Sequence, residues 1–160
     1  MTCFASSVGM GKVEDFVGRT ATNCRTHNEP FSFYGVDIGM GRAILPTVYT
    51  IRNRKASSHV LMNWNFEVSN DKATWITLDQ RIHITGNHDQ DAYMDKDIKA
   101  LKAAGAASSW AVNTDIYREL GYDGFRYFRI IQIGKNSSDS DNLALSGFEL
   151  YGQVTKGRWP

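Results

Sequence analysis

A short basic stretch, "IRNRKASSHV" at residues 51–60, holds the side chains with the clearest capacity for ligand chemistry. Arginine presents a planar fork of donors that suits a carboxylate or a phosphate, and lysine adds a less directional positive charge. Three cations fall within four residues here, so the stretch could bind an acidic peptide or an anionic headgroup. A solvated loop is the alternative interpretation. The candidate ligand-binding residues are Arg52, Arg54, Lys55 and His59.

Two further polar stretches add candidates of a different kind. Residues 20–29 contribute Arg25 and His27, and "KNSSDSDN" at 135–142 begins with Lys135, Asn136 and Ser137. Hydroxyl and amide groups can hydrogen-bond to sugars or to a peptide backbone. An ordinary polar loop or a flexible turn is the alternative for each stretch.

The remaining polar motifs favour neither a metal centre nor catalysis. His88, Asp89 and Asp91 in "GNHDQD" could contribute to a calcium site, but the central Gly and distal Glu of an EF-hand are missing. An acidic loop that caps a helix is the favoured interpretation. The sequence contains no GxSxG, HExxH or Walker motif and no glycine-rich dinucleotide turn. We therefore expect a protein that is not an enzyme and uses no cofactor or metal.

Composition places the chain among ordinary globular domains. It has 160 residues, 42% hydrophobic and 22% charged, with a net charge of +1. Such a balance disfavours a main role in binding nucleic acid. No apolar run is long enough to span a membrane, and the N-terminus lacks the features of a signal peptide. Two cysteines are too few for a disulfide scaffold, so we expect reduced thiols and a cytoplasmic location.

Hydrophobic periodicity predicts a mostly β protein. Met62, Trp64, Phe66 and Val68 alternate with polar residues, and the "NDK" turn leads into another strand pattern, which together predict a hairpin over 62–80. Short helices are expected in "MDKDIKALKAAG" and "IYRELGYDG", each ending at a glycine. The predicted strands are 31–38, 44–52, 62–69, 74–84, 108–113, 125–134 and 145–154.

Strand direction has a consequence for function. If successive strands are antiparallel, the connections at 20–30, 52–61, 85–92 and 135–144 all lie at one end of the molecule. The "NDK" turn and the C-terminus then lie at the other end. Long polar loops gathered on a rigid scaffold are common places for binding sites.

Several individual residues receive structural predictions. The aromatic residues of the strand segments are assigned to the core. Pro46 indicates an edge position or a strand that starts at Thr47, because proline cannot donate to a sheet ladder. Arg129 is expected to pair with an acidic group such as Asp37. The strands 125–134 and 145–154 are treated as partners.

Several segments together resemble a known family. They are "FSFYGVDIG", "PTVYTIRNR", "NWNFEVSNDKATWITL", "SSWAVN" and "GFRYFRIIQIGKNSSDSDNLALSGFELYG", in that order. The pattern is similar to the galactose-binding-like β-sandwich related to discoidin (F5/8 type C) and DOC domains. The most similar version is embedded in large intracellular proteins, including HECT-type and BTB-containing ubiquitin-ligase components.

The resemblance implies an eight-stranded antiparallel jelly roll with one or two short helices and with both termini at one end. It covers about residues 5–154 of a single domain, 1–160, which could be excised from a larger protein. Members of the family are mostly non-catalytic, and discoidin relatives bind glycans, phospholipids or peptides through loops opposite the termini. Two departures, the Ala/Lys-rich segment 86–109 and a basic loop without a glycine-rich run, leave the ligand open.

These considerations predict a recognition module for a protein or peptide partner, plausibly in a ubiquitin-ligase component. A carbohydrate-binding module using the same loops is the alternative, and it requires an exposed loop aromatic such as Tyr93, or Phe31 or Tyr34 near a strand. Membrane-surface binding is a third hypothesis. It requires exposed apolar side chains beside the basic loop, where Val60 and Leu61 precede the strand residue Met62.

Overall fold

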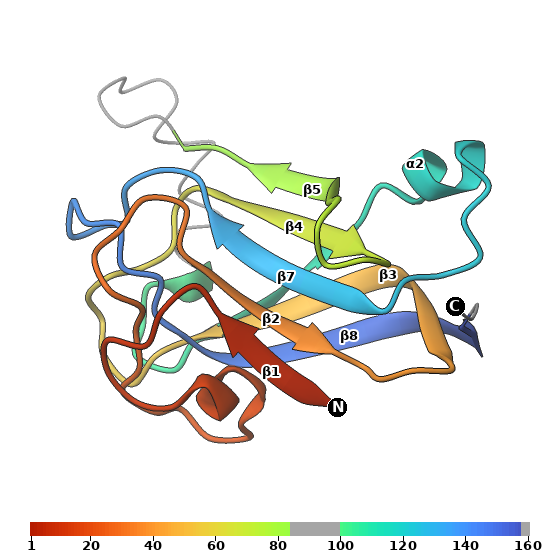
Figure 1. The fold of residues 1–160 in the computed structure, drawn as a ribbon. Helices are drawn as coiled ribbons and strands as arrows, with labels where there is room; N and C mark the ends of the chain where they lie inside the picture. Colours follow the sequence, from red (N-terminus) through yellow and green to blue (C-terminus); the bar gives the residue numbers. More distant parts are fainter. Residues whose placement is uncertain (84–99, 158–160) are drawn as a thin grey trace.

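The computed structural model describes residues 1–83 and 100–157 as a β-sandwich (Figure 1). This part of the chain contains eight strands, one 3-10 helix and one short α-helix. In chain order they are β1 (Thr2–Ala5), η1 (Val13–Val17), β2 (Phe33–Asp37), β3 (Arg42–Asn53), β4 (Trp64–Ser69), β5 (Ile76–Arg81), β6 (Ala107–Ala111), α2 (Thr114–Glu119), β7 (Tyr127–Gln132) and β8 (Leu145–Lys156).

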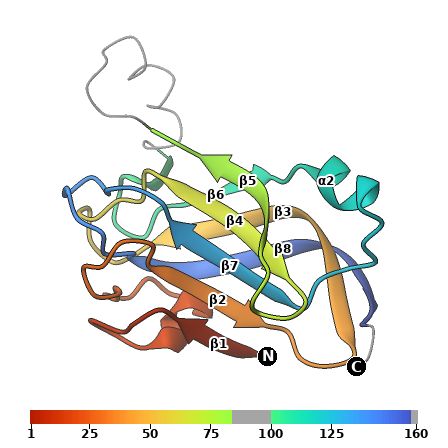
Figure 2. The same cartoon turned by 45° about the horizontal axis from the view of Figure 1, so that its top comes forward.

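The strands form two layers, and every strand pair is antiparallel. The larger sheet has the order β1-β2-β7-β4-β5, and the smaller sheet has the order β6-β3-β8. Figure 2 shows the smaller sheet behind the larger one. The predicted antiparallel jelly-roll sandwich with a short helix is confirmed.

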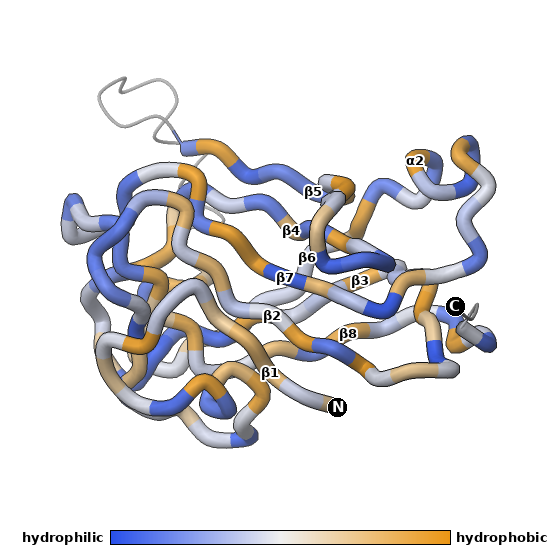
Figure 3. The backbone as a smooth tube through the Cα atoms, in the orientation of Figure 1, coloured by the Kyte–Doolittle hydropathy of each residue, from blue (hydrophilic) through white to orange (hydrophobic). Residues whose placement is uncertain are grey.

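The hydrophobic core lies between the two sheets. In β7, Phe128 and Ile130 are fully buried, while Tyr127 and Arg129 point to the outer face. In Figure 3 this strand, in the middle of the larger sheet, has a hydrophobic stretch interrupted by hydrophilic residues. Full burial of one such side chain contributes about 1.5–3 kcal/mol. Trp64 and Trp110 belong to the same core, as predicted, whereas Trp75 is only half-buried.

Strand β4 is more buried than its alternating pattern indicates. Asn65 and Glu67, on its polar face, are only 9% and 8% exposed. Buried polar groups need partners. Glu67 accepts hydrogen bonds from Asn65 Nδ2 at 3.2 Å and Thr77 Oγ1 at 3.0 Å, and Arg129 Nη2 donates to its Oε1 at 2.7 Å. The outer face of the larger sheet therefore has its own polar network.

The prediction that Arg129 pairs with an acidic group is confirmed, but the group is Glu67 and not Asp37, which was given as the example. Arg129 lies opposite Glu67 in the β4–β7 register, and Asp37 instead accepts from Arg126 Nε at 2.7 Å. Register brings these groups together across strands that are distant in the sequence, so the identity of each partner could not be read from local spacing.

Two predictions about strand neighbours also need correction. Strands β7 and β8 lie in different sheets, so the loop between them crosses the sandwich instead of closing a hairpin. Strand β3 continues through Pro46 although it is the central strand of its sheet. Proline is tolerated because β6 pairs with β3 only from Val48 onward and the β8 register shifts at this point.

The predicted hairpin over 62–80 is confirmed by β4 and β5. The predicted helical turn before a glycine is also confirmed: Asn113 caps α2 by accepting from Asp115 N, and Gly121 follows the helix with φ of 72°. The "GNHDQD" loop and the first half of "MDKDIKALKAAG", residues 94–99, lie outside the described residues, and of the second half Ala100 and Leu101 are helical.

The long connections meet at one end of the sandwich, as strand direction predicted. Lys55 N donates to Thr22 O at 2.9 Å, His59 N to Ser138 Oγ at 2.9 Å, and Asp141 N to Asn28 Oδ1 at 2.8 Å. We call this the loop end, made of residues 6–32, 54–63 and 133–144. Figure 1 shows it opposite the N-terminus and the end of β8, which lie at the termini end. The predicted loop 85–92 lies outside the described residues.

Candidate functional site

Arg54 is the most unusual cation of the loop end. It follows β3 directly and is only 6% exposed. Its Nη2 donates to Ser58 Oγ at 2.7 Å and to His59 Nδ1 at 2.8 Å. Its buried Nε has no hydrogen-bond partner in the described part of the chain. A buried charged group with unmet donors is expensive unless something neutralises it.

The contact with Arg54 determines the tautomer of His59. A guanidinium can only donate, so His59 Nδ1 must be the acceptor. The proton of the neutral ring therefore lies on Nε2, which leaves that atom as a donor. Burial and the charges of Arg54 and Arg25 lower the pKa of His59 below its ordinary 6.5. The backbone of His59 has φ of 57°, a conformation that few non-glycine residues adopt.

No acid compensates these cations within residues 1–83 and 100–157. Burial lowers the pKa of Arg54, and the charge of Arg25 lowers it further. Burial raises the pKa of the nearby Cys24 thiol to about 11, so this group is neutral and cannot serve as a counter-ion. Lys55 follows Arg54 directly in the chain and is exposed. We call Arg25, Arg54, Lys55 and His59 the cationic cluster.

Arg52 differs from Arg54 because its hydrogen bonds are satisfied by the fold. Its Nη2 donates to Gly18 O at 2.6 Å, its Nη1 to Arg19 O at 3.0 Å and its Nε to Ser146 O at 3.2 Å. The side chain thus holds the segment after η1 against β8. Its predicted ligand contact stays a prediction, and we leave it out of the cluster.

The three candidates at the start of the 135–144 loop also have intramolecular partners. Asn136 is buried: its Nδ2 donates to Asn142 O at 2.8 Å, and its Oδ1 accepts from Ser138 N at 3.0 Å. Ser137 Oγ accepts from Val60 N at 2.9 Å, and Lys135 Nζ contacts Asp141 Oδ2 at 2.6 Å. These residues shape the loop and attach it to residues 59–60. Their contact with a ligand stays a prediction.

The segment 6–32 places two further side chains at the loop end. His27, a predicted candidate, is exposed. Phe31 is 64% exposed, with φ of 59°. Sequence reasoning named Phe31 only as a residue near a strand. Because β2 begins at Phe33, Phe31 lies in the loop, while Tyr34 is buried.

A pocket of about 620 Å³ opens at the same end. It lies between the start of β4, the end of β5 and the loop after β7. The lining residues include Met62, Asn63, Ile82, His83, Ile133 and Lys135. Val60 and Leu61, beside the cationic cluster in the chain, are buried at 2% exposure each, so they are not the exposed apolar side chains that the membrane hypothesis requires.

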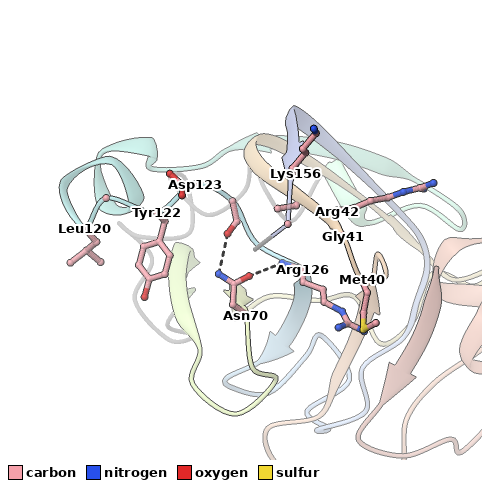
Figure 4. Close-up of a pocket in the computed structure, with 13 residues that line it drawn as sticks. Met40, Gly41, Arg42, Asn70, Leu120, Tyr122, Asp123, Arg126 and Lys156 are labelled. Atoms are coloured by element: carbon pink, nitrogen blue, oxygen red, sulfur yellow. Dashed lines mark hydrogen bonds between the residues drawn. The ribbon is translucent and has the colours of Figure 1, made fainter. Parts of the chain in front are cut away.

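A second pocket, of about 560 Å³, lies at the termini end (Figure 4). Arg42, Lys156 and Arg126 contribute its cations. Arg126 is neutralised by Asp37, whose pKa its guanidinium lowers, and Asn70 bridges Arg126 N and Gly124 O. Among the described residues this end has no buried cation without an acidic partner, as Arg54 is, and the loop end is therefore the better candidate site.

Neither a metal cluster nor a disulfide is found where the structure describes the chain. No group of three His, Cys, Asp or Glu residues there could hold a metal ion. Cys3 and Cys24 are free thiols. No helix in the described ranges is long and apolar enough to cross a membrane.

Solved structures with the same architecture include sugar-complexed domains. The lectin domain of lectinolysin, complexed with Lewis B antigen, aligns with 95% of this chain and 92% of its own, at 14% identity and a TM-score of 0.62. The CBM32 of AlyQ, complexed with 4,5-unsaturated mannuronic acid, aligns over 94% of both chains at 12% identity and a TM-score of 0.61. This chain has the galactose-binding-like β-sandwich fold. At such low identity the similarity establishes the fold alone.

Two curated proteins resemble the galactose-binding-like domain in sequence. E3 ubiquitin-protein ligase Ufd4 of Drosophila melanogaster is 32% identical over 148 residues, which is 90% of this chain. E3 ubiquitin-protein ligase hecd-1 of Caenorhabditis elegans is 30% identical over 158 residues, which is 96% of it. The chain spans only 5% of the length of either relative. No protein-family profile matches the sequence.

Proposed function

We propose that this galactose-binding-like domain is a non-catalytic recognition module that binds a protein or peptide partner through its loop end. The observation that carries the proposal is Arg54, a nearly buried cation without an acidic partner in the described part of the chain. Its counter-charge would come from an acidic side chain or a C-terminal carboxylate of the partner. Lys55 and His27, both exposed, lie at the same end.

The sequence relatives suggest the cellular setting. Because both are E3 ubiquitin-protein ligases, the domain is proposed to recruit a substrate or partner within a larger ligase-type protein. A cytoplasmic location is part of the same proposal.

Selection of displayed peptides on the purified chain tests the proposal. We expect selected peptides to share an acidic group and to lose affinity at least about tenfold with Arg54→Gln or Lys55→Ala, which corresponds to about 1.4 kcal/mol. Arg42→Gln and Lys156→Ala are the matched controls, since both cations lie at the termini end. Equal loss with the control variants, or selection of peptides without any acidic group, would contradict a loop-end site.

A carbohydrate-binding module is the second candidate, and Phe31 favours it. An aromatic ring that is 64% exposed on a loop could stack on a sugar ring. A glycan array would then give hits that Phe31→Ala abolishes, whereas the peptide proposal expects no such hits. Loss of peptide binding in the same variant, without any glycan signal, would instead assign Phe31 to the peptide site.

A further inference from the structure

We propose that the cationic cluster binds a doubly charged phosphoryl group, carried by a phosphorylated serine or threonine of the partner. This inference rests on the proposed function and names the chemical class of its ligand. Four observations support it: donors without a partner, cations without an ion pair in the described residues, the number of charges, and the side chains that surround the cluster.

The donors of the cluster are available for an anion. Arg54 Nη2 is used by Ser58 and His59, and Nη1 makes no hydrogen bond within residues 1–83 and 100–157. The Nε atom also has no partner there, but it is enclosed and does not itself face a ligand. His59 contributes Nε2–H, because its Nδ1 is already an acceptor. Ser58 and His59 fix the position of the Arg54 guanidinium. Its remaining donor is therefore preorganised for binding.

Charge balance favours a phosphoryl group over a carboxylate. Arg25, Arg54 and Lys55 carry three positive charges, and none has an ion pair in the described part of the chain. A phosphate monoester carries close to two negative charges at neutral pH and has three acceptor oxygens. A carboxylate carries one charge and two oxygens, so it would leave more of the cluster uncompensated.

The surroundings favour a peptide over a membrane surface. Stable adsorption to an anionic membrane typically uses four to eight basic residues on one face. Here the cluster has only three cations, Arg25, Arg54 and Lys55, which is fewer than that. Met10 is 41% exposed and pairs with Arg25 through a backbone bridge, so an apolar side chain of a peptide could pack beside the phosphoryl group.

The test compares three peptide libraries of identical composition, with a central phosphoserine, serine or glutamate, on the purified chain. We expect the phosphoserine library to be retained at least about tenfold more strongly than the glutamate library, and the serine library to be retained least. N-acetyl-phosphoserine amide should shift the backbone amide signals of residues 25 and 54–59 in NMR spectra. Arg54→Gln and Arg25→Gln should each weaken binding about tenfold or more, since each variant removes a charge-assisted hydrogen bond to the phosphoryl group. Arg42→Gln should leave it unchanged.

The outcomes separate this inference from the proposed function. Equal retention of the glutamate library would overturn the phosphoryl inference and leave peptide recognition standing. Failure of every library would overturn both. Binding to vesicles with phosphoinositide in phosphatidylcholine, without binding of the phosphoserine library, would replace the peptide by a lipid. The thermal midpoint of Arg54→Gln shows whether this variant folds. If it does not fold, Arg25→Gln replaces it in the binding test, because Arg25 is only half-buried.

Discussion

At the residue scale, three arginines show how local partners decide what a cation does. Arg129 is neutralised by Glu67 and Arg126 by Asp37, with contacts of 2.7 Å in both cases. Arg54 is more deeply buried than either and has no carboxylate partner among the described residues. Arg129 and Arg126 stabilise the outer face of the larger sheet, whereas in our proposal Arg54 binds a ligand. Stability measurements distinguish these roles.

Replacing Arg54 by Gln should leave the free energy of unfolding unchanged or raise it by about 1 kcal/mol. The variant removes a buried charge that lacks a counter-ion, and binding sites often reduce stability in this way. Chemical denaturation of the purified chain measures the effect. A loss of more than about 2 kcal/mol would show that Arg54 is a structural residue and weaken its assignment to a site.

Replacing Arg129 by Gln should have the opposite effect. Glu67 is 8% exposed and would keep its charge without the guanidinium that lies 2.7 Å away. Breaking one side of a buried ion pair typically costs about 3–5 kcal/mol. Denaturation of the double variant with Glu67→Gln is the control, because removal of both charges should recover part of the loss. No recovery would indicate that packing of Arg129 on Trp75, at 4.1 Å, matters more than the charge.

His59 predicts a pH dependence of stability. The groups that face it are Arg54, Arg25, Ser58 and Ser138, of which two are cationic, and its folded-state pKa lies below 6.5. As the pH falls through 6.5, the unfolded chain binds a proton before the folded chain does. Stability should therefore fall below pH 6.5 until the folded pKa is passed, and His59→Gln should reduce this slope. An NMR titration with a His59 pKa at or above 6.5 in the free domain would contradict this.

At the scale of elements, β3 and its neighbours build the site. Strand β3 delivers Arg52 and Arg54 to the loop end, Arg52 attaches the segment after η1, and Asn136 folds the loop after β7. The cluster is thus held by three segments that meet only in the folded molecule. Their positions depend on the order of strands within each sheet.

The close approach of β1 to Gly35 in β2 allows a test of how strongly the strand order of the larger sheet depends on close packing. A Cβ at this position would lie 2.3 Å from Phe4 Cζ and 2.8 Å from Phe128 O. Gly35→Ala should therefore push β1 away from β2 and lower stability by about 1–3 kcal/mol. Gly18→Ala is the control, with ordinary φ of −66° and a nearest atom at 3.3 Å. Equal thermal midpoints for the two variants would mean that β1 adjusts without loss.

At the scale of the whole molecule, the two ends of the sandwich differ in function in our proposal. The loop end carries the cationic cluster and the pocket beside Met62, and the termini end carries the pocket shown in Figure 4. A ligand held by the loops leaves the termini end free for attachment to the rest of a larger protein.

Hydrogen exchange with a selected peptide bound tests this division. Protection should increase for amides in 22–28, 54–60 and 135–142, and stay unchanged for 38–41 and 120–126. The physical reason is that bound ligand slows the local opening of only those loops that contact it. Protection centred on Arg42 and Tyr122 would place the binding surface at the other end.

Much of the architecture could be predicted from the sequence because strand patterns are local. The alternation in 62–69, the turn that follows it and the glycine after α2 each depend on neighbouring residues only. Strand direction then placed the connections 20–30, 52–61 and 135–144 at one end, without knowledge of which strands pair. Strands β7 and β8 were predicted to pair but lie in different sheets. They still run in opposite directions, so the prediction for the loop between them was unaffected.

The sequence by itself determined a β-sandwich with basic and polar loops at one end. Only the tertiary structure decided which cations there remain uncompensated. Arg52 and Arg54 are two positions apart and chemically identical, yet Arg52 donates to the carbonyls of residues 18, 19 and 146 while Arg54 keeps a buried Nε without a partner in the described chain. The reason is physical: a side chain's partners come from segments that cross it in space, and long-range strand order sets those crossings.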